Sequence, residues 1–367
     1  MDLSGDPHAE KEENAIVAQD YYENISRWVH SYPVPSPGSG FAALSATNLQ
    51  LAGYGLPERP NAVTEPELYR FWEKMLGGST EVVAPEFPTD KEIEPRGFVA
   101  HRHGPGAQRR TAGPAIRGFD HREDSRNWSG AYITPTRPNR FVQVMGGWTV
   151  PAPEAPRVPP SGADRDNVDY HSSTWIGIGG HRPYNSLPQI GTAQRVVLEN
   201  GQPTVVMGAW FQWWVKGRRE THKPIPILNF PVAAGDEILA SLTVDAPGDV
   251  HFNLKNQRTG RHVTFKAVAP AGILPLGATA EWVHERPTKI ESRDLHPLPR
   301  CTDVVFDHCL ALSAPKLGGL AKLETLDNHR LIRMYEDFDD PHRTAFVSIP
   351  EKTGATSVRI RYREPGV

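Results

Sequence analysis

The greater part of the chain consists of short runs in which hydrophobic and polar positions alternate. The runs are rich in β-branched and aromatic residues, and turn-forming residues separate them. This pattern predicts half-buried strands joined by tight turns. The predicted strands are 141–150, 204–215, 236–244, 250–256, 262–268 and 304–313, with a closing hairpin from 344–349 and 357–363. Their number and spacing favour an all-β fold, an antiparallel β-sandwich.

One stretch, 171–194, differs because glycines interrupt its apolar core. It reads HSSTWIGIGGHRPYNSLPQIGTAQ. We interpret it as a strand around Trp175, a tight loop, and the start of a second strand that carries Gln189. Much later in the chain, Glu281 begins another alternating strand. Our hypothesis is that Gln189 and Glu281 meet in space and form a catalytic pair.

The N-terminal region has a helical pattern instead. Apolar residues at near-helical spacing in 6–32 predict one amphipathic helix. A second helix is predicted from Thr64, as its N-cap, to Leu76, and Gly77 would end it.

A stretch rich in Pro, Gly, Arg and His, 79–126, then predicts a linker. The chain would therefore divide into an N-terminal extension, 1–126, and a β-sandwich domain, 127–367. The extension could be a propeptide that is cut between about 101 and 126, or a permanent subdomain packed on the sandwich.

Charge and composition narrow the class of protein. The formal net charge is −3, so no global field favours nucleic acid or an anionic membrane as a partner. No apolar stretch reaches the roughly 18 residues of a membrane helix. The first residues lack the basic start and apolar core of a secretory signal, which makes the cytoplasm the default compartment. Cys301 and Cys309 are too few for a disulfide framework; they could close one small loop or remain reduced.

Several common catalytic motifs do not occur. The sequence lacks GxSxG, HExxH, GxxxxGK[ST] and CxxC. WIGIGGHR begins like a dinucleotide fingerprint, but Arg182 stands where the third glycine should be. The histidines are scattered, so packed or polar roles are favoured over metal binding for His171, His181 and His284. No ExDxxE pattern occurs on a strand, which weakens a glycoside hydrolase reading.

An ordered set of motifs does carry a resemblance. NWSGAYI, WTVPAP, STWIGIGG, LPQIGTA, GAWFQWW, FPVAAGDEI, TGRHVTF and TAEWVHE follow one another from Asn127 onward. This set resembles the glutamic peptidases of the eqolisin type, and 49–76 resembles the leader of bacterial relatives. The resemblance implies a concanavalin A-like (lectin-like) sandwich of two sheets bent around an open cleft. It also implies a polypeptide substrate, no metal or cofactor, and secretion by analogy.

The resemblance further implies a catalytic dyad. The family's glutamine falls on Gln189, its glutamate on Glu281 and its cleft tryptophan on Trp175. Peptide hydrolysis needs an activated water, a proton for the leaving amine and a donor for the oxyanion. Glu281 would take a proton from water and pass it to the amine, while the amide of Gln189 would stabilise the oxyanion.

The neighbours of Glu281 follow from strand alternation. Glu281 and Glu285 should lie on one face of this strand, because side chains alternate between its two faces. Two neighbouring carboxylates resist double ionisation, so at least one should have a raised pKa. Alternatively, Glu285 pairs with Arg286 or another cation.

The aromatic strand should likewise have two different faces. Trp210, Gln212 and Trp214 share one face, and by resemblance this face lines the cleft and binds substrate. Alternatively, these tryptophans belong to the core.

Three departures from the family pattern affect the expected activity. Gly179, Ala193 and Gln212 stand where the family usually has acidic residues. The loss of three carboxylates should move the pH optimum toward neutral or lower the activity. The leading function is an endopeptidase. A non-catalytic peptide- or carbohydrate-binding sandwich, and a glycoside hydrolase using Glu281 with Glu285, are the alternatives.

Overall fold

The strands form two layers, and each layer follows from the alternation in its sequence. The computed structural model describes residues 25–36, 39, 41–88, 122–157, 166–181, 185–245, 248–269, 272–289, 294–337 and 344–364. The first layer has the order β10 (Ile225–Ile227), β9 (Gln202–Val215), β8 (Ser186–Glu199), β7 (Val168–Ile178), β14 (Ala280–Glu285), β4 (Trp128–Ile133) and β18 (His329–Asp337). The second layer has the order β13 (Arg261–Ala267), β12 (Val250–Asn256), β11 (Glu237–Val244), β5 (Arg140–Thr149) and β16 (Val304–Ala314).

The two layers are joined along one edge. Strand β20 (Ser357–Tyr362) pairs with β16 of the second layer and with β19 (Thr344–Gly354), and β19 pairs with β18 of the first layer. The backbone ladder is therefore continuous from one layer to the other. Shorter strands complete the edges: β1 (Val29–Ser31) and β2 (Glu81–Val83) on β13, β3 (Arg122–Ser125) on β18, and β17 (Lys322–Glu324) on β16, while β6 (Pro153–Glu154) pairs with β15 (Arg300–Cys301).

The main core lies between the layers. Aromatic residues of both layers fill it, for example Phe211 and Trp282 from the first layer and Phe252 and Phe265 from the second. The rings of Phe252 and Phe265 stack with centroids 5.1 Å apart. The predicted antiparallel β-sandwich is confirmed. In the turn between β12 and β13, Gly260 has a φ of +72°.

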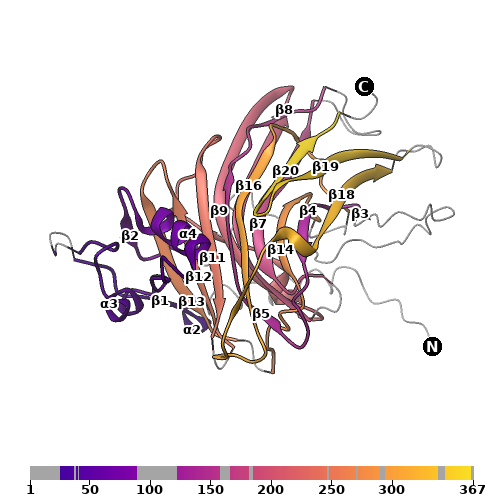
Figure 1. The fold of residues 1–367 in the computed structure, drawn as a ribbon. Coiled ribbons are helices and arrows are strands. Elements are labelled where there is room, and N and C mark those ends of the chain that lie inside the picture. Colours follow the sequence, from indigo (N-terminus) through magenta and orange to yellow (C-terminus); the bar gives the residue numbers. More distant parts are fainter. Residues whose placement is uncertain are drawn as a thin grey trace, which may run out of the picture.

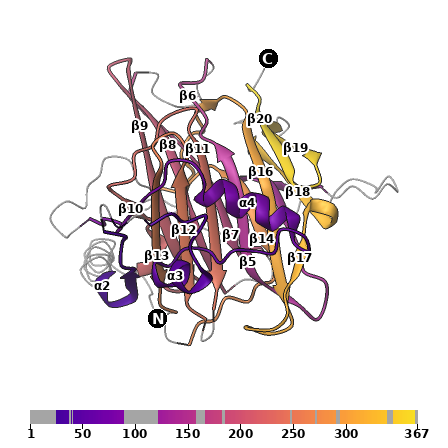
Figure 2. The same cartoon turned by 60° about the vertical axis from the view of Figure 1, so that its left-hand side comes forward.

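The N-terminal segment contains α2 (Ile25–Trp28), α3 (Asn48–Gly53) and α4 (Pro66–Leu76). Helices α3 and α4 pack on the outside of the second layer (Figures 1 and 2), whereas Ile25 and Trp28 of α2 pack against the main core. Phe71 and Trp72 of α4 form a cluster with Leu239 and Leu310, which project from the outer face of this layer. The buried ammonium of Lys255 donates to the carbonyl of Gly77 at 2.6 Å, just after α4. Residues 41–88 therefore share a core with the second layer.

The helix predicted over 6–32 is wrong at its end. Only Ile25–Trp28 is helical in the described part of that range, and Val29–Ser31 is a strand that pairs with β13. The open edge of β13 offers backbone partners there, and this tertiary pairing overrides the local periodicity. Residues 6–24 lie outside the described part of the chain.

The second predicted helix is confirmed as α4, although its N-cap is Glu65 and not Thr64. The amide of Thr64 donates to the side chain of Asn61 at 3.0 Å, in a turn that precedes the helix. The predicted linker over 79–126 contains β2 and β3, and residues 89–121 are outside the described part. The division at 126 stays a prediction.

Both cysteines are free thiols. No helix among the described residues is long and apolar enough to cross a membrane. Two short 3-10 helices, η2 (Arg219–His222) and η3 (Leu326–Asn328), complete the description.

Candidate active site

One row of side chains across the first layer brings Gln189 and Glu281 together. In the register of the sheet, Gly177 of β7 is opposite Gln189 on one side and opposite Glu281 on the other. Directly opposed residues point to the same side of a sheet, and neighbouring strands are about 4.8 Å apart. The two backbones are therefore about 10 Å apart, with only a glycine between them. The row continues to Gln212 of β9 and to Tyr132 of β4.

This side of the layer, opposite to the main core, is called the glutamine–glutamate face below. The alternation predicted for β14 is confirmed, because Val283 lies on this face while Trp282 lies in the main core. The two faces of β9 are also as predicted. Trp210 and Trp214 belong to the cluster on the glutamine–glutamate face, and Phe211 belongs to the main core.

Glu281 is fully buried, and a loop holds one of its carboxylate oxygens. Oε1 accepts hydrogen bonds from the backbone N–H of Gly180 at 2.8 Å and of His181 at 3.2 Å. Oε2 is buried and has no hydrogen-bond partner among the described residues. The loop therefore anchors the carboxyl group at one of its two oxygens.

Burial raises the pKa of Glu281 from 4.5 to about 7, although the hydrogen bonds from Thr279 and from the loop amides act in the opposite direction. The sequence predicted a raised pKa from the neighbouring Glu285. The main physical cause is instead desolvation, which penalises the charged form.

Gln189 is held in one orientation by Gln212. The side-chain N–H of Gln212 donates to the carbonyl of Thr221 at 2.8 Å, and that carbonyl can only accept. The side-chain oxygen of Gln212 must therefore face Gln189, whose Nε2 donates to it at 2.8 Å. This chain of bonds fixes which end of each amide is the donor.

Glu285 is also buried, and its carboxylate is hydrogen-bonded. It accepts from the indole N–H of Trp175 at 2.8 Å and from the side chain of Asn127 at 3.4 Å. Arg286 forms an ion pair with Glu336 at 2.8 Å, and a pairing of Glu285 with Arg286 or another cation stays a prediction. The two glutamates of β14 thus have different surroundings: one is held by side chains, the other by a backbone loop.

The tryptophans assigned to substrate binding lie around the row and are buried. Trp175 and Trp210 occupy the next row of the face, on either side of Gly191. Trp214 is 5% exposed, and the ring of His222 from η2 stacks on it at 5.6 Å. The positions agree with an aromatic surround of the row; a role in binding substrate stays a prediction.

The departures from the family pattern have local explanations. Gly179 has a φ of +90°, a conformation that favours glycine. At Gln212, the carbonyl of Thr221 requires a donor, which an amide provides and an ionised carboxylate does not. The structure gives no such reason for Ala193.

The sequence interpretation missed a network next to Glu281. Glu123 of β3 accepts from the hydroxyl of Tyr132 at 2.6 Å and forms an ion pair with His181 at 3.0 Å. Glu123 lay in the predicted linker, and its partner strand β18 is some 200 residues away in the chain. No local pattern in the sequence could show this parallel pairing.

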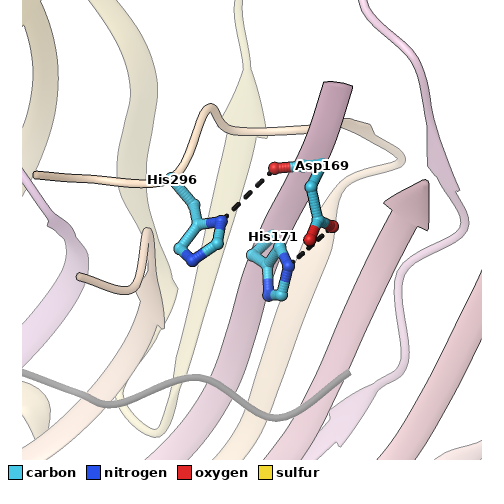
Figure 3. Close-up of side chains that lie close together, drawn as sticks. All are labelled: Asp169, His171 and His296. Carbon is cyan, nitrogen blue, oxygen red and sulfur yellow. Dashed lines mark hydrogen bonds and ion pairs between the residues drawn. The ribbon is translucent and has the colours of Figure 1, made fainter. Parts of the chain in front are cut away.

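One cluster has residue types that bind metals. Asp169, His171 and His296 place their ligand atoms within 4.8 Å of one another (Figure 3). However, Arg195 already donates to both oxygens of Asp169, at 2.6 and 2.5 Å. The two imidazole rings also pack against each other in a tilted arrangement, with centroids 3.9 Å apart, whereas the rings of two histidines on one metal ion point toward a common centre. The cluster fits an ion pair with two packed histidines better than a metal site. His284 is likewise packed, with Thr174 as its partner at 3.1 Å.

The fold and the site together define a β-sandwich with a buried row of side chains that contains Gln189 and Glu281. A comparison with family models shows the family to which such a protein belongs. A family model described as the peptidase A4 family matches residues 126–330, more than half of the chain. The chain belongs to the peptidase A4 family, the eqolisin peptidases, and is therefore a protease. The resemblance found in the sequence is confirmed.

Several solved structures are similar to this chain. Scytalido-glutamic peptidase with a transition state analog inhibitor is 19% identical, with a TM-score of 0.47, over 65% of this chain and 98% of that one. SCP-B, an eqolisin in complex with the tripeptide Ala-Ile-His, is 18% identical, with a TM-score of 0.46 and the same coverage. Aspergilloglutamic peptidase from Aspergillus niger is 19% identical, with a TM-score of 0.40, over 53% and 99%. These scores are low, so the family assignment rests on the family model. No curated protein matches the chain.

Proposed function

We propose that this peptidase is a glutamic endopeptidase in which Gln189 and Glu281 form the catalytic dyad. The observation that carries the proposal is the row itself. An oriented amide and a buried carboxyl group lie on one face with Gly177 between them, so no side chain of β7 separates them.

The chemistry follows from the two oxygens of Glu281. Oε1 is held by loop amides, and Oε2 would accept a proton from a water molecule as the water oxygen attacks the peptide carbonyl carbon. Glu281 would then give this proton to the amide nitrogen as the C–N bond breaks, so the carboxylate is regenerated. The amide of Gln189 would donate to the oxyanion of the tetrahedral intermediate. One such donor typically contributes about 100- to 1000-fold in rate.

The pKa of Glu281 suits this exchange. A group that must take and return a proton works best with a pKa near the operating pH. With a pKa of about 7, Glu281 would be ionised, and therefore active as a base, above neutral pH. We expect an optimum near neutral, in line with the loss of acidic residues at Gly179, Ala193 and Gln212.

The substrate would be an extended polypeptide. Trp175, Trp210 and Trp214 would flank its side chains, because they project from the same face as the dyad. Gln212 would keep the amide of Gln189 in its orientation, and Glu285 would hold the indole of Trp175.

The test is cleavage of an unfolded protein by the wild type and by the Glu281→Gln and Gln189→Ala variants, from pH 2 to 9. Glu237→Gln is a matched control, because Glu237 pairs with Lys74 on the far side of the molecule. Cleavage by the wild type and the control alone supports the dyad. Wild-type rates in both dyad variants would refute it. Absence of cleavage at every pH, with retained peptide binding, would favour a non-catalytic binding module.

A further inference from the structure

We infer that Glu123, His181 and Tyr132 form a positioning network that holds the loop after β7 against Glu281 and so controls the protonation of this residue. The inference rests on the proposed function of Glu281 as the base. It adds Glu123, which precedes the residues that the family model matches, 126–330.

The network is closed by three contacts. Glu123 uses one carboxylate oxygen for the hydroxyl of Tyr132, at 2.6 Å, and the other for Nε2 of His181, at 3.0 Å. The rings of Tyr132 and His181 are in contact, with centroids 4.3 Å apart. Three segments that are distant in sequence, β3, β4 and the loop after β7, therefore meet at one carboxylate.

His181 connects this network to the proposed base. Its imidazole binds Glu123, while its backbone N–H donates to Oε1 of Glu281 at 3.2 Å and to Thr279 at 3.2 Å. The N–H of Gly180, one residue earlier, donates to the same oxygen at 2.8 Å. The ring and the backbone N–H of His181 belong to one residue, and Gly180 is its neighbour in the chain. Fixing the ring therefore restricts the directions of the backbone N–H groups of both Gly180 and His181.

The direction of the effect follows from these donors. Hydrogen bonds from the backbone favour the ionised carboxylate, whereas burial favours the protonated form. For Glu281 burial is the larger cause, so its pKa is raised to about 7 in spite of the amides. Release of the loop would remove donors and raise the pKa of Glu281 further.

Other polar and charged groups lie on the strands around Glu281. Arg330 of β18 lies opposite Tyr132 in the sheet and favours ionisation of Glu123. The hydrogen bond from His181 is the largest cause that lowers the pKa of Glu123. Along β14, Glu285 is bound by side chains of its own, and the β8 side of the row presents the neutral Gln189. Glu123 therefore binds the loop that holds Glu281.

The test compares two neighbouring acids of β3. Glu123→Gln removes the charge that holds His181. Asp124→Asn is the matched control, because Asp124 has a similar exposure, 44% against 39%, and forms an ion pair with Arg333 at 2.7 Å. The titration of Glu281 is followed by ¹³C NMR of labelled glutamate carboxyls, with Glu281→Gln to assign the signal. The pH profile of kcat/KM is measured on the same variants.

In Glu123→Gln we expect the pKa of Glu281 to rise by about one unit, which lowers kcat/KM about tenfold on the acid side of the profile. Asp124→Asn should leave the pKa of Glu281 and the pH profile of kcat/KM unchanged. Tyr132→Phe keeps the ring and removes one hydrogen-bond donor to Glu123, so it should raise the pKa of Glu281 by a smaller amount. This variant provides the test if Glu123→Gln does not fold. An unchanged Glu281 titration in Glu123→Gln and Tyr132→Phe would overturn the network, even if the dyad stands. A wild type without any cleavage would overturn the proposed function, while the NMR titration would still decide on the network.

Discussion

The clearest physical consequence of the site is that Glu281 should destabilise the protein above neutral pH. A glutamate that is fully buried, with one oxygen lacking a described partner, is difficult to ionise. Glu281→Gln keeps the size of the side chain and removes its charge. The amide oxygen of the new side chain can accept the bonds from Gly180 and His181, as Oε1 does in the wild type. The variant should therefore be more stable than the wild type at alkaline pH.

The magnitude follows from the pKa of Glu281. It rises from 4.5 to about 7 on folding, and each pKa unit corresponds to about 1.4 kcal/mol, so ionisation in the folded state costs about 3 kcal/mol. Between these two values the folded chain binds a proton that the unfolded chain has already lost. The stabilisation is thus complete below about pH 4.5, falls as pH rises, and is lost above about pH 7.

The assay is urea-induced unfolding of the wild type and Glu281→Gln at pH 4.5 and pH 8.5. We expect the two proteins to differ little in their free energy of unfolding at pH 4.5 and by about 3 kcal/mol, in favour of the variant, at pH 8.5. Glu285→Gln is the contrasting control. In the wild type the carboxylate of Glu285 accepts hydrogen bonds from Trp175 and Asn127. In the variant, the side-chain N–H groups of the glutamine would face one of these two donors. The free energy of unfolding should therefore fall by about 1–3 kcal/mol.

The result that refutes this reasoning is a difference between wild type and Glu281→Gln that does not change with pH. It would mean that Glu281 has an ordinary pKa in the folded protein. The proposed proton exchange by Glu281 would then lack electrostatic support, whatever the activity assays show.

Three further predictions follow from other contacts. Gln212→Glu puts a carboxylate against the carbonyl of Thr221 and should lower the free energy of unfolding in urea by about 1–3 kcal/mol. The loss should be larger at pH 8 than at pH 5, where a protonated acid can still donate to this carbonyl. Equal losses at the two pH values would contradict this reasoning. Phe71→Ala should cost about 3–5 kcal/mol but leave kcat/KM unchanged, because α4 covers the second layer and not the glutamine–glutamate face; a stable variant with raised activity would favour the propeptide hypothesis. Trp175→Phe removes the indole donor to Glu285 and should cost about 1–3 kcal/mol in the same assay; no change in stability would show that this bond contributes little.

Much of the site could be predicted because strand alternation is a strictly local rule. A period of two residues placed Glu281 and Glu285 on one face and Trp282 on the other. The motif order then identified Gln189 as the partner. The sequence could not show that Gly177 would stand between Gln189 and Glu281, because the register of strands is decided by pairing between distant segments.

Contacts between distant segments account for what was missed. Glu123 lies in a stretch whose composition predicted a linker, and only its pairing with β18 makes it part of the site. The source of the raised pKa of Glu281 was also misjudged, because the depth of burial is a property of the whole fold. One signal was available but overlooked. Thr47 and Gln50 form a capping box at the start of α3, and the T-x-x-Q spacing of this motif is present in the sequence.

The continuous edge between the layers has a consequence for how the protein can be divided. Strands β19 and β20 lie beyond residue 330, where the family match ends, yet they connect β16 to β18. A fragment limited to 126–330 would lack this connection and would also lose most of β18. It would therefore present open strand edges in both layers, and open edges promote association between chains. We therefore expect the segment 126–330 to need the flanking strands β19 and β20 to form a closed sandwich.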